Sequence, residues 1–348
     1  MNPSQPIYTI GRHLVEQEKD FPKATGEFTS LLWDLTIAFK IISNEVNNAG
    51  LGQALGLAGF ENVHGEEVRE LDVFAHEMIF RAMDHGGHLC LMASEESHDV
   101  IPIPKKFKKG KYILLFDPLD GSSNIDVSAG IGSIFSILRK VTDGEDGSLE
   151  DCLQPGVQQV AAGYVVYGSN TMLVYTTGQG VNGFTLDPAI GEFLLSHRNV
   201  RIPKRGNIYS VNEGSHRFWD EPTRRFVAWL KSDRNDLGKP YSLRYIGSMV
   251  SDVHRTLLKG GVFLHPANCE NPDRPKAKLR LLYEANPMAF ILEEAGGKAV
   301  TGSGRILQVS PVELHERVPV IMGSPFEVEM YERFGKEEFT PEPTRDPA

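Results

Sequence analysis

The chain has 348 residues, 41% of them hydrophobic and 24% charged, and its formal net charge is −10 at pH 7. This length and composition are typical of a globular protein with two lobes. The acidic balance argues against nucleic acid as a partner, and no apolar stretch is long enough to cross a membrane. Cys90, Cys152 and Cys269 form no paired motif, and the N-terminus resembles neither a signal nor a transit peptide. We therefore expect a cytoplasmic protein.

The order of the predicted elements indicates a layered α/β protein rather than a simple alternation of strands and helices. Helical periodicity predicts helices over 31–42 and 71–83, with a mobile loop at 49–67 between them. Apolar runs then predict strands at 89–93, 112–116, 133–138, 161–167 and 172–176, and a surface loop at 143–156. After Pro203 the pattern predicts helices at 226–230, 249–258 and 281–295 and a strand at 261–264. A boundary between two lobes is expected near 197–206.

The stretch 116–124, Phe-Asp-Pro-Leu-Asp-Gly-Ser-Ser-Asn, is the strongest functional signal in the chain. It directly follows the apolar run 112–115, so we expect Asp117 and Asp120 on a tight turn at the end of a buried strand. The proline stiffens this turn, the glycine lets the backbone approach a ligand closely, and the two serines supply hydrogen-bond donors. Carboxylates beside such donors suit hard cations that bridge a protein to a phosphate group.

Further carboxylates accompany this turn. Glu95 and Glu96 follow a predicted strand, and Asp72 and Glu284 lie near the start of predicted helices. Each alone would be an ordinary cap or a solvated side chain. Together they could hold two or three Mg²⁺ ions about 3.5–4 Å apart, an arrangement that serves phosphoryl transfer. One carboxylate that binds no cation would still be needed to take a proton from the attacking water.

Other catalytic designs find little support. The chain has no G-x-S-x-G motif of an esterase and no G-x-x-x-x-G-K-[ST] motif of a P-loop. The glycines at 50–56 miss the dinucleotide-binding spacing by one residue. A metal-dependent phosphatase is the interpretation that the residues favour.

With these carboxylates assembled, the chain resembles class I fructose-1,6-bisphosphatase. The motif at 117–123 alone indicates only the wider superfamily of lithium-sensitive sugar and inositol phosphatases. The narrower resemblance covers residues 8–335 and depends on longer stretches, at Thr25–Thr29, Leu153–Gly156, Ala161–Tyr164, Arg244–Met249, Asp252–Arg255 and Lys278–Gly297. It implies an α-β-α-β-α sandwich with an N-terminal lobe at 1–200, a sugar-phosphate-binding lobe at 201–335 and a polar tail at 336–348.

The resemblance also implies roles for individual residues. The metal ligands would be Glu95, Asp117, Asp120 and Glu284, with the backbone carbonyl of Leu119. Glu96, oriented by Asp72, would activate the attacking water. The 1-phosphate would be held by Gly121, Ser122 and Ser123, and the sugar with its 6-phosphate by Asn212, Arg244, Tyr245, Met249 and Lys278. The implied cofactor is Mg²⁺, with Mn²⁺ as a possible substitute.

Two positions depart from the family pattern. His265 and Ser215 each stand where the family usually has a tyrosine near the distal phosphate. Histidine can donate a hydrogen bond there, and we expect it to do so better when protonated. An insertion at 269–275 lengthens the approach to Lys278. These departures bear on affinity and substrate range rather than on the reaction.

A second binding site is implied at the start of the first long helix. Free N–H groups there favour a phosphate group, and family members bind the inhibitor AMP at the positions matching Thr25, Gly26, Glu27, Thr29, Lys111, Tyr112 and Arg139. In the family, the loop at 49–67, with Glu66, closes over the metals. The family arginine that matches Arg244 crosses from a neighbouring subunit, which implies a homo-oligomer, a tetramer by resemblance.

The expected reaction is therefore hydrolysis of fructose 1,6-bisphosphate to fructose 6-phosphate in gluconeogenesis, by direct in-line attack without a phosphoenzyme. Plant chloroplast relatives carry a cysteine-rich insertion near residue 150, where this chain has only Cys152, so we expect no thiol switch. Sedoheptulose 1,7-bisphosphatase activity, alone or in addition, is the enzymatic alternative. A catalytically silent sensor of nucleotides or sugar phosphates is the alternative from another class.

Overall fold

The computed structural model describes residues 7–19, 26–49, 57–61 and 67–336. The α-helices are α1 (Ile10–Glu18), α2 (Glu27–Asn48), α3 (Glu70–Met83), α4 (Leu149–Cys152), α5 (Glu221–Lys231), α6 (Met249–Lys259), α7 (Asn286–Glu294) and α8 (Pro325–Gly335). The short helical turns are η2 (Ser122–Val127), η3 (Gly156–Gln158), η4 (Glu213–Phe218), η5 (Leu281–Ala285) and η6 (Ile306–Gln308).

The described strands form a large sheet of eight strands, a small sheet of five strands and one hairpin. The eight-stranded sheet contains β3 (Leu89–Ser94), β4 (Ile101–Pro102), β5 (Tyr112–Asp120), β6 (Ile131–Arg139), β7 (Ala161–Tyr167), β8 (Thr171–Thr176), β9 (Val181–Asp187) and β10 (Glu192–Val200), in the order β10-β9-β8-β7-β6-β5-β3-β4. The five-stranded sheet contains β11 (Ile208–Ser210), β12 (Ser242–Leu243), β13 (Val262–His265), β14 (Lys298–Val300) and β15 (Val320–Gly323), in the order β12-β11-β13-β15-β14. The hairpin pairs β1 (Leu57–Glu61) with β2 (Glu67–Arg69).

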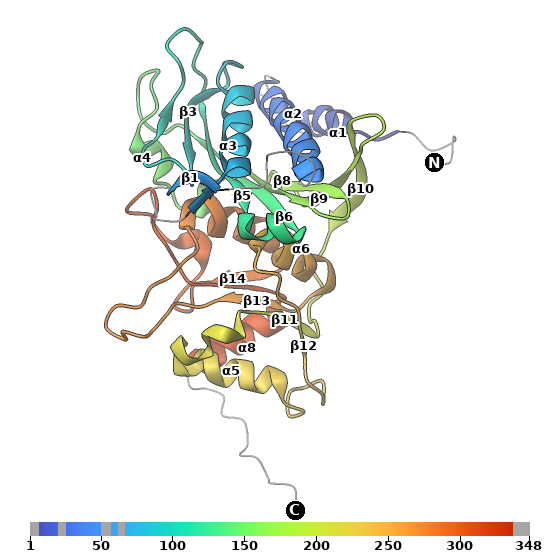
Figure 1. The fold of residues 1–348 in the computed structure, drawn as a ribbon, viewed down its shortest axis with the longest axis vertical. Coiled ribbons are helices and arrows are strands. Elements are labelled where there is room, and N and C mark those ends of the chain that lie inside the picture. Colours follow the sequence, from blue (N-terminus) through green and yellow to red (C-terminus); the bar gives the residue numbers. More distant parts are fainter. Residues whose placement is uncertain (1–6, 20–25, 50–56, 62–66, 337–348) are drawn as a thin grey trace, which may run out of the picture.

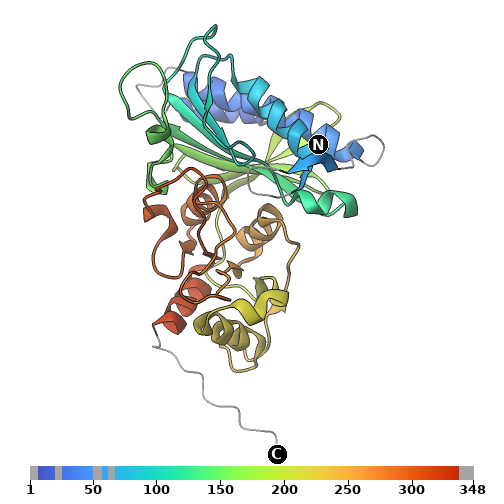
Figure 2. The same ribbon diagram turned by 60° about the vertical axis from the view of Figure 1, so that its left-hand side comes forward.

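These elements stack in five layers (Figure 1). Helices α1, α2 and α3 cover the outer face of the large sheet, and α6 and α7 lie between the two sheets. Helices α5 and α8 cover the outer face of the small sheet, as the turned view in Figure 2 also shows. The arrangement confirms the predicted α-β-α-β-α sandwich with two lobes.

The middle layer explains why α7 is apolar on more than one side. Both sheets contact this helix, so Met288, Ala289, Ile291 and Leu292 are all buried, whichever way they face. A helix that is hydrophobic all round is stable only when it is covered all round. Helix α7 therefore holds the two sheets together across one shared core.

Strand β5 is longer and less regular than predicted. It continues past Phe116 to Asp120, with all nine residues buried. Asp117 faces Ile134 on β6 while Asp120 faces Gly132, so β5 has one extra residue in this interval. Such a bulge bends the strand and re-aims the side chains after it. The predicted turn between the two aspartates is thus a bulge within a strand.

Most predicted helices and strands are confirmed, but several elements were not predicted, among them α1, α8, β11, β14 and β15. The segment read as a loop at 49–67 contains β1 and β2 among its described residues, while 50–56 and 62–66, with Glu66, lie outside them. Strands β9 and β10 were not predicted. The predicted helix at 281–295 divides into the π-helical turn η5 and helix α7. No helix within the described ranges combines the length and apolar character that a membrane crossing requires.

The loop between β6 and β7 is organised by one buried carboxylate. Asp151 accepts the N–H groups of Val141 and Thr142, each at 2.8 Å, and that of Ser148 at 2.8 Å. Burial opposes its ionisation, but the bonds from Thr142, Val141 and Ser148 outweigh burial and lower the pKa of Asp151 to about 2. The acidic segment read as a surface loop is therefore tied to the sheet.

We predict that Asp151→Asn lowers the free energy of unfolding by about 2–3 kcal/mol at pH 7, because an amide nitrogen would face donors. The pKa of Asp151 is lower in the folded than in the unfolded chain, so the carboxylate stabilises fully above about pH 4. This contribution is lost as the pH falls through about 2. Urea unfolding at pH 7, 4 and 3 measures it, with the exposed Asp143→Asn as control. If the unfolding free energies of the wild type and Asp151→Asn differ by the same amount at all three pH values, the lowered pKa of Asp151 is contradicted.

Candidate active site

A cavity of about 470 Å³ lies where the two lobes meet. It is lined by residues predicted for the metal and phosphate sites, namely Glu95, Glu96, Asp117, Leu119, Asp120, Gly121, Ser122, Ser123 and Glu284. It is also lined by residues predicted for the sugar and distal phosphate, namely Tyr245, Met249, His265 and Lys278. The fold therefore brings together most of the residues that the sequence singled out. Asp72, Asn212 and Arg244 do not line this cavity.

Three carboxylates form the acidic cluster of the cavity. One oxygen from each of Asp117, Asp120 and Glu284 lies within 4.8 Å of the others. Residues three apart on a regular strand face opposite sides of the sheet. The bulge in β5 corrects this difference, so that Asp117 and Asp120 reach the same cavity.

Glu284 reaches the cluster from the π-helical turn η5. The N–H of Ala285 bonds the carbonyl of Arg280, five residues earlier, at 3.0 Å. The carboxylate of Glu284 accepts the N–H of Arg280 at 2.6 Å. A π-turn widens the helix, and such turns are frequent at functional sites. Here the turn carries Glu284 into the cavity between the sheets.

The N-terminus of α6 holds Asp120. Its carboxylate accepts the hydroxyl of Ser248 at 2.6 Å and the N–H groups of Met249 and Val250 at 3.2 and 2.8 Å. The free N–H groups and dipole at a helix start favour such an anion. A carboxylate of the large sheet is thus bound by a helix of the middle layer.

Gly121 makes this contact possible. Its φ is 74°, and a Cβ built on it would lie 2.5 Å from the Cβ of Ser248. An L residue would be strained by the backbone and would also clash with Ser248. The sequence predicted a glycine here because the backbone approaches a ligand closely. The structure adds a second reason, since the two lobes also approach each other closely at Gly121.

Glu95 and Glu96 occupy the turn that follows β3. The N–H of Glu95 bonds the carbonyl of Phe116 at 3.0 Å, and the N–H of Glu96 bonds the hydroxyl of Ser94 at 3.3 Å. Glu95 also pairs with Arg280 at 2.5 Å, with both side chains at most 7% exposed. The two glutamates therefore enter the cavity from one fixed turn.

The electrostatics of the cluster suit divalent cations. Burial raises the pKa of Asp117, and the neighbouring Glu95, Glu284 and Asp120 raise it further. Burial raises the pKa of Asp120 and raises that of Glu284 to about 8. Carboxylate oxygens are the ligands that Mg²⁺ prefers, and cations among them would offset this repulsion. The donor set therefore fits the predicted metal.

The cavity is also lined by Tyr245, Met249, His265 and Lys278. Burial, and then the charge of Lys278, lower the pKa of His265 to about 4. This environment favours the neutral ring at pH 7, so the stronger donation expected of a protonated ring does not apply to the protein without substrate. Any hydrogen bond that His265 gives to a substrate comes from the neutral imidazole.

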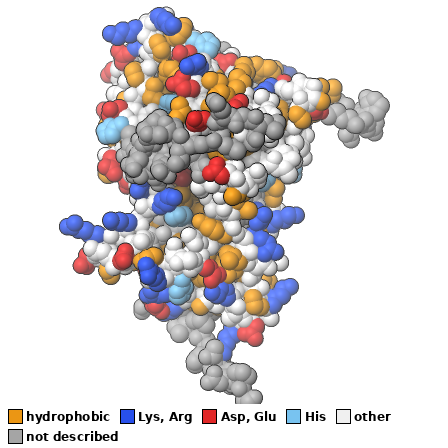
Figure 3. Space-filling model, viewed as in Figure 1, with side chains coloured by type: hydrophobic (Ala, Val, Ile, Leu, Met, Phe, Trp, Pro, Cys, Tyr) orange, Lys and Arg blue, Asp and Glu red, His pale blue; other side chains and the backbone are white. Residues whose placement is uncertain are grey.

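Two other predicted substrate residues lie elsewhere. The side chain of Asn212 caps η4 by accepting the N–H of Gly214 at 3.1 Å. Arg244 is exposed and lines a separate hollow with Arg255 and Lys259. Within one copy of the chain, neither side chain lines the cavity. Figure 3 shows Lys and Arg side chains gathered over the C-terminal lobe on the face drawn.

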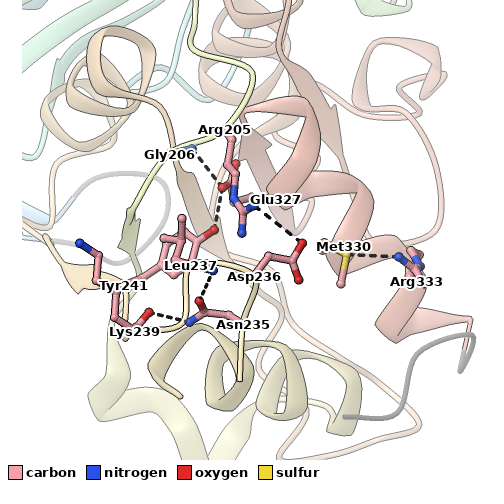
Figure 4. Close-up of polar contacts among 10 residues, drawn as sticks. All are labelled: Arg205, Gly206, Asn235, Asp236, Leu237, Lys239, Tyr241, Glu327, Met330 and Arg333. Atoms are coloured by element: carbon pink, nitrogen blue, oxygen red, sulfur yellow. Dashed lines mark hydrogen bonds and ion pairs between the residues drawn. The ribbon is translucent and has the colours of Figure 1, made fainter. Parts of the chain in front are cut away.

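Residues 241–247, here called the arm, carry Arg244 and Tyr245. A buried carboxylate anchors the first residue of the arm (Figure 4). Glu327, on α8, accepts the N–H of Gly206 at 3.0 Å and the hydroxyl of Tyr241 at 2.9 Å. Tyr241 directly precedes β12, and Gly206 lies on the segment that connects the two sheets. Burial raises the pKa of Glu327. This contact fixes the start of the arm against α8.

The predicted nucleotide site is assembled in part. Thr25 lies outside the described residues, and Gly26 directly precedes α2 with a φ of 76°. Lys111 pairs with Glu27, the first residue of α2, at 2.6 Å. These groups lie together at the start of the helix.

Two further predicted residues join this group, and one bonds elsewhere. The guanidinium of Arg139 lies 5.3 Å from the centre of the Tyr112 ring, which also packs against Phe28. The hydroxyl of Thr29 bonds the carboxylate of Glu18 at 2.9 Å. The position of Thr29 depends on that contact between α1 and α2.

Sequence reasoning missed Arg280 and Ser248, both of which line the cavity. Ser248 stands directly before an apolar helical pattern, which is the usual signal of a helix cap. Arg280 is a basic residue four positions before Glu284, in an apolar run. That position alone does not distinguish a solvated arginine from the buried partner of Glu95.

We predict that, without divalent cations, Glu284→Gln unfolds at a higher temperature than the wild type at pH 9. The pKa of Glu284, about 8, exceeds its ordinary value of 4.5, so the wild type loses stability as the pH rises from about 4.5 to about 8, and the loss is complete above 8. Mg²⁺ should stabilise the wild type more than the variant, because the variant lacks one charged ligand. Thermal unfolding with EDTA or Mg²⁺ measures both effects, and the exposed Glu313→Gln serves as control. Equal gains from Mg²⁺ would contradict the metal site.

Comparisons with known proteins identify the family of the chain. Two family models match the chain, "Fructose-1-6-bisphosphatase, N-terminal domain" over residues 8–198 and "Fructose-1-6-bisphosphatase, C-terminal domain" over residues 202–336. A relative from Nitratidesulfovibrio vulgaris, named fructose-1,6-bisphosphatase class 1, is 54% identical over 328 residues, which are 94% of this chain and 97% of that protein. A relative of the same name from Chloroherpeton thalassium is 55% identical over 329 residues, 94% and 93% of the two chains.

A solved structure extends the agreement to three dimensions. The crystal structure of Leishmania major fructose-1,6-bisphosphatase in holo form has a TM-score of 0.87 and 41% sequence identity. The match covers 95% of this chain and all of that one. Two family models, relatives that match over almost their full length and a shared three-dimensional fold all give the same result. The chain belongs to the fructose-1,6-bisphosphatase family.

Proposed function

We propose that the protein hydrolyses the 1-phosphate of D-fructose 1,6-bisphosphate, with Mg²⁺, to fructose 6-phosphate and phosphate, as a step of gluconeogenesis. One observation carries the proposal. A single cavity between the lobes has a buried acidic cluster beside Gly121 and two serines, and Tyr245 and Lys278 elsewhere on its wall. A substrate with two phosphate groups would use both parts, and the membership of the family supports this substrate.

The residues that would hold the cations are Asp117, Asp120, Glu284 and Glu95, with the carbonyl of Leu119. When bound, Mg²⁺ neutralises the charge of the phosphate group and acidifies a water molecule. The chain must then keep these carboxylates ionised and fixed. Hydrogen bonds from the start of α6 to Asp120, and from the N–H of Arg280 to Glu284, serve this purpose.

Glu96 is the proposed general base. It lines the cavity beside Glu95 but is not part of the close cluster of three carboxylates. It would take the proton of the attacking water while the water oxygen bonds to phosphorus. The bond between phosphorus and the C1 oxygen then breaks, and the C1 oxygen takes up a proton. Asp72, buried in the first turn of α3, is proposed to orient Glu96.

The N–H groups and hydroxyls of Gly121, Ser122 and Ser123 would hold the reacting phosphate group, because they start η2 directly after Asp120. Lys278 and Tyr245 would contact the distal phosphate, and Met249 and His265 would line the sugar pocket. Both sugar bisphosphates present a similar furanose 1-phosphate end, and His265 lines the cavity where the family usually has a tyrosine. Sedoheptulose 1,7-bisphosphate is therefore the second candidate substrate.

The proposal extends to regulation and assembly. AMP would bind near the start of α2, where Lys111 and Glu27 pair beside Tyr112 and Arg139, and would inhibit the enzyme. Arg244, exposed outside its own cavity, would reach the cavity of a neighbouring copy within a tetramer. Sedimentation of the purified protein at four times the mass of the chain would support the tetramer. The cytoplasmic location stays a prediction.

We predict phosphate release from fructose 1,6-bisphosphate that requires Mg²⁺ and stops with EDTA. Asp120→Ala should lower kcat by about 10³-fold or more, because it removes both a cation ligand and the anion that α6 holds. Phosphate release is measured in parallel with sedoheptulose 1,7-bisphosphate and with Asp126→Ala, a control on the neighbouring turn. Release of phosphate from neither sugar under any divalent cation would favour the silent sensor.

We also predict that AMP inhibits the wild type and that Lys111→Met raises the AMP concentration for half-inhibition at least tenfold. The substitution removes a cation at the proposed phosphate site. Lys109→Met is the matched control, because Lys109 pairs with Asp146 instead. Each rate is expressed relative to the same variant without AMP. A wild-type rate that does not change with AMP would contradict the regulatory site.

A further inference from the structure

The segment 312–318 contacts two parts of the chain that carry carboxylates of the cavity. On one side, the N–H of Leu281 bonds the carbonyl of Glu316 at 2.7 Å, and the N–H of Val318 bonds the carbonyl of Leu279 at 2.9 Å. These bonds hold the chain that leads into η5 and Glu284. On the other side, the same segment contacts the turn after β3 through one side chain, His315.

His315 grips that turn by its backbone. Its Nε2 lies 3.0 Å from the carbonyl oxygen of Ser97 and 3.3 Å from that of His98. Both partners are acceptors, so Nε2 must carry the proton and donate it. Burial lowers the pKa of His315, which favours the neutral ring. The ring also packs on Tyr283, the residue before Glu284, with centroids 5.4 Å apart.

The gripped turn carries Glu95 and Glu96. Bonds to Phe116 and Ser94 fix its first half, and the N–H of Ser97 bonds the carbonyl of Ser94 at 3.2 Å. His315 fixes the second half from the other lobe. Two side-chain contacts therefore connect the turn to the chain around η5: the ion pair of Glu95 with Arg280 in the first half of the turn, and His315 in the second half.

We propose that His315 is a positioning residue for phosphate hydrolysis: its donation to the carbonyls of Ser97 and His98 places Glu96 relative to the acidic cluster. The inference rests on the proposed function, since it assigns Glu96 the role of the base. It adds a residue from the far lobe that touches neither substrate nor cation. Groups that orient a catalytic side chain typically affect activity 10–100-fold.

The test compares substitutions of His315 in the full-length protein. His315→Leu removes the donor and should lower kcat about 10–100-fold, while KM for fructose 1,6-bisphosphate stays within about twofold. His315→Gln places an amide nitrogen near the position of Nε2 and should restore kcat to within about threefold. His315→Asn, whose amide is too short to reach both carbonyls, should not. Val312→Ala, at a residue 78% exposed on the same segment, should behave as the wild type.

A double-mutant cycle with Glu96→Gln distinguishes positioning from general support of the fold. If His315 acts through Glu96, then His315→Leu should cost less than about twofold in the Glu96→Gln background. If the losses in kcat from His315→Leu and Glu96→Gln multiply in the double variant, the role of His315 is overturned. A His315→Gln variant with no higher kcat than His315→Asn would overturn it as well. Where His315→Leu does not fold, the comparison of Gln with Asn still decides. A wild type that releases no phosphate would instead overturn the proposed function itself.

Discussion

Asp117, Asp120 and Glu284 are buried with oxygens within 4.8 Å of one another, although like charges repel strongly away from water. The surrounding structure meets this constraint group by group. The start of α6 binds Asp120, and a backbone N–H binds Glu284. The neighbouring Glu95 pairs with a buried guanidinium, that of Arg280. Each solution uses a different donor, and each requires its element to lie at one particular place between the sheets.

This requirement explains where the backbone is irregular. The bulge in β5, the π-turn η5 and the left-handed Gly121 all surround the cluster, whereas the described strands of the large sheet pair regularly between β6, β7 and β8. Regular strands and helices would place the carboxylates on opposite faces or away from the cavity. Irregular backbone is therefore concentrated where the chemistry needs it, and regular backbone supplies the rigid frame.

The same contrast separates what the sequence predicted from what it could not. Apolar runs such as Tyr112–Phe116 predicted buried strands correctly, because burial on both faces leaves a continuous hydrophobic signal. Strand β10 escaped prediction since most of its second half is exposed and polar. The bulge was invisible because period-two alternation places Asp117 and Asp120 on opposite faces. The burial that lowers the pKa of His265 could not be predicted either, since a motif carries no information on burial. The contacts of His315 could not be predicted because they are with backbone carbonyls, which every residue has.

The contact between Asp120 and α6 has a thermodynamic consequence. The carboxylate that would bind a cation is also the anion at the start of α6, a helix that packs on β6 and β7 of the eight-stranded sheet and on β11 and β13 of the five-stranded sheet. A shift of α6 relative to the large sheet therefore changes the orientation of Asp120, and any change at Asp120 alters the energy of the helix start. The movement of α6 and the binding of a cation at Asp120 therefore share one coupling free energy, so each changes the equilibrium of the other by the same factor. Affinity at the acidic cluster is thus linked to the packing of the two lobes.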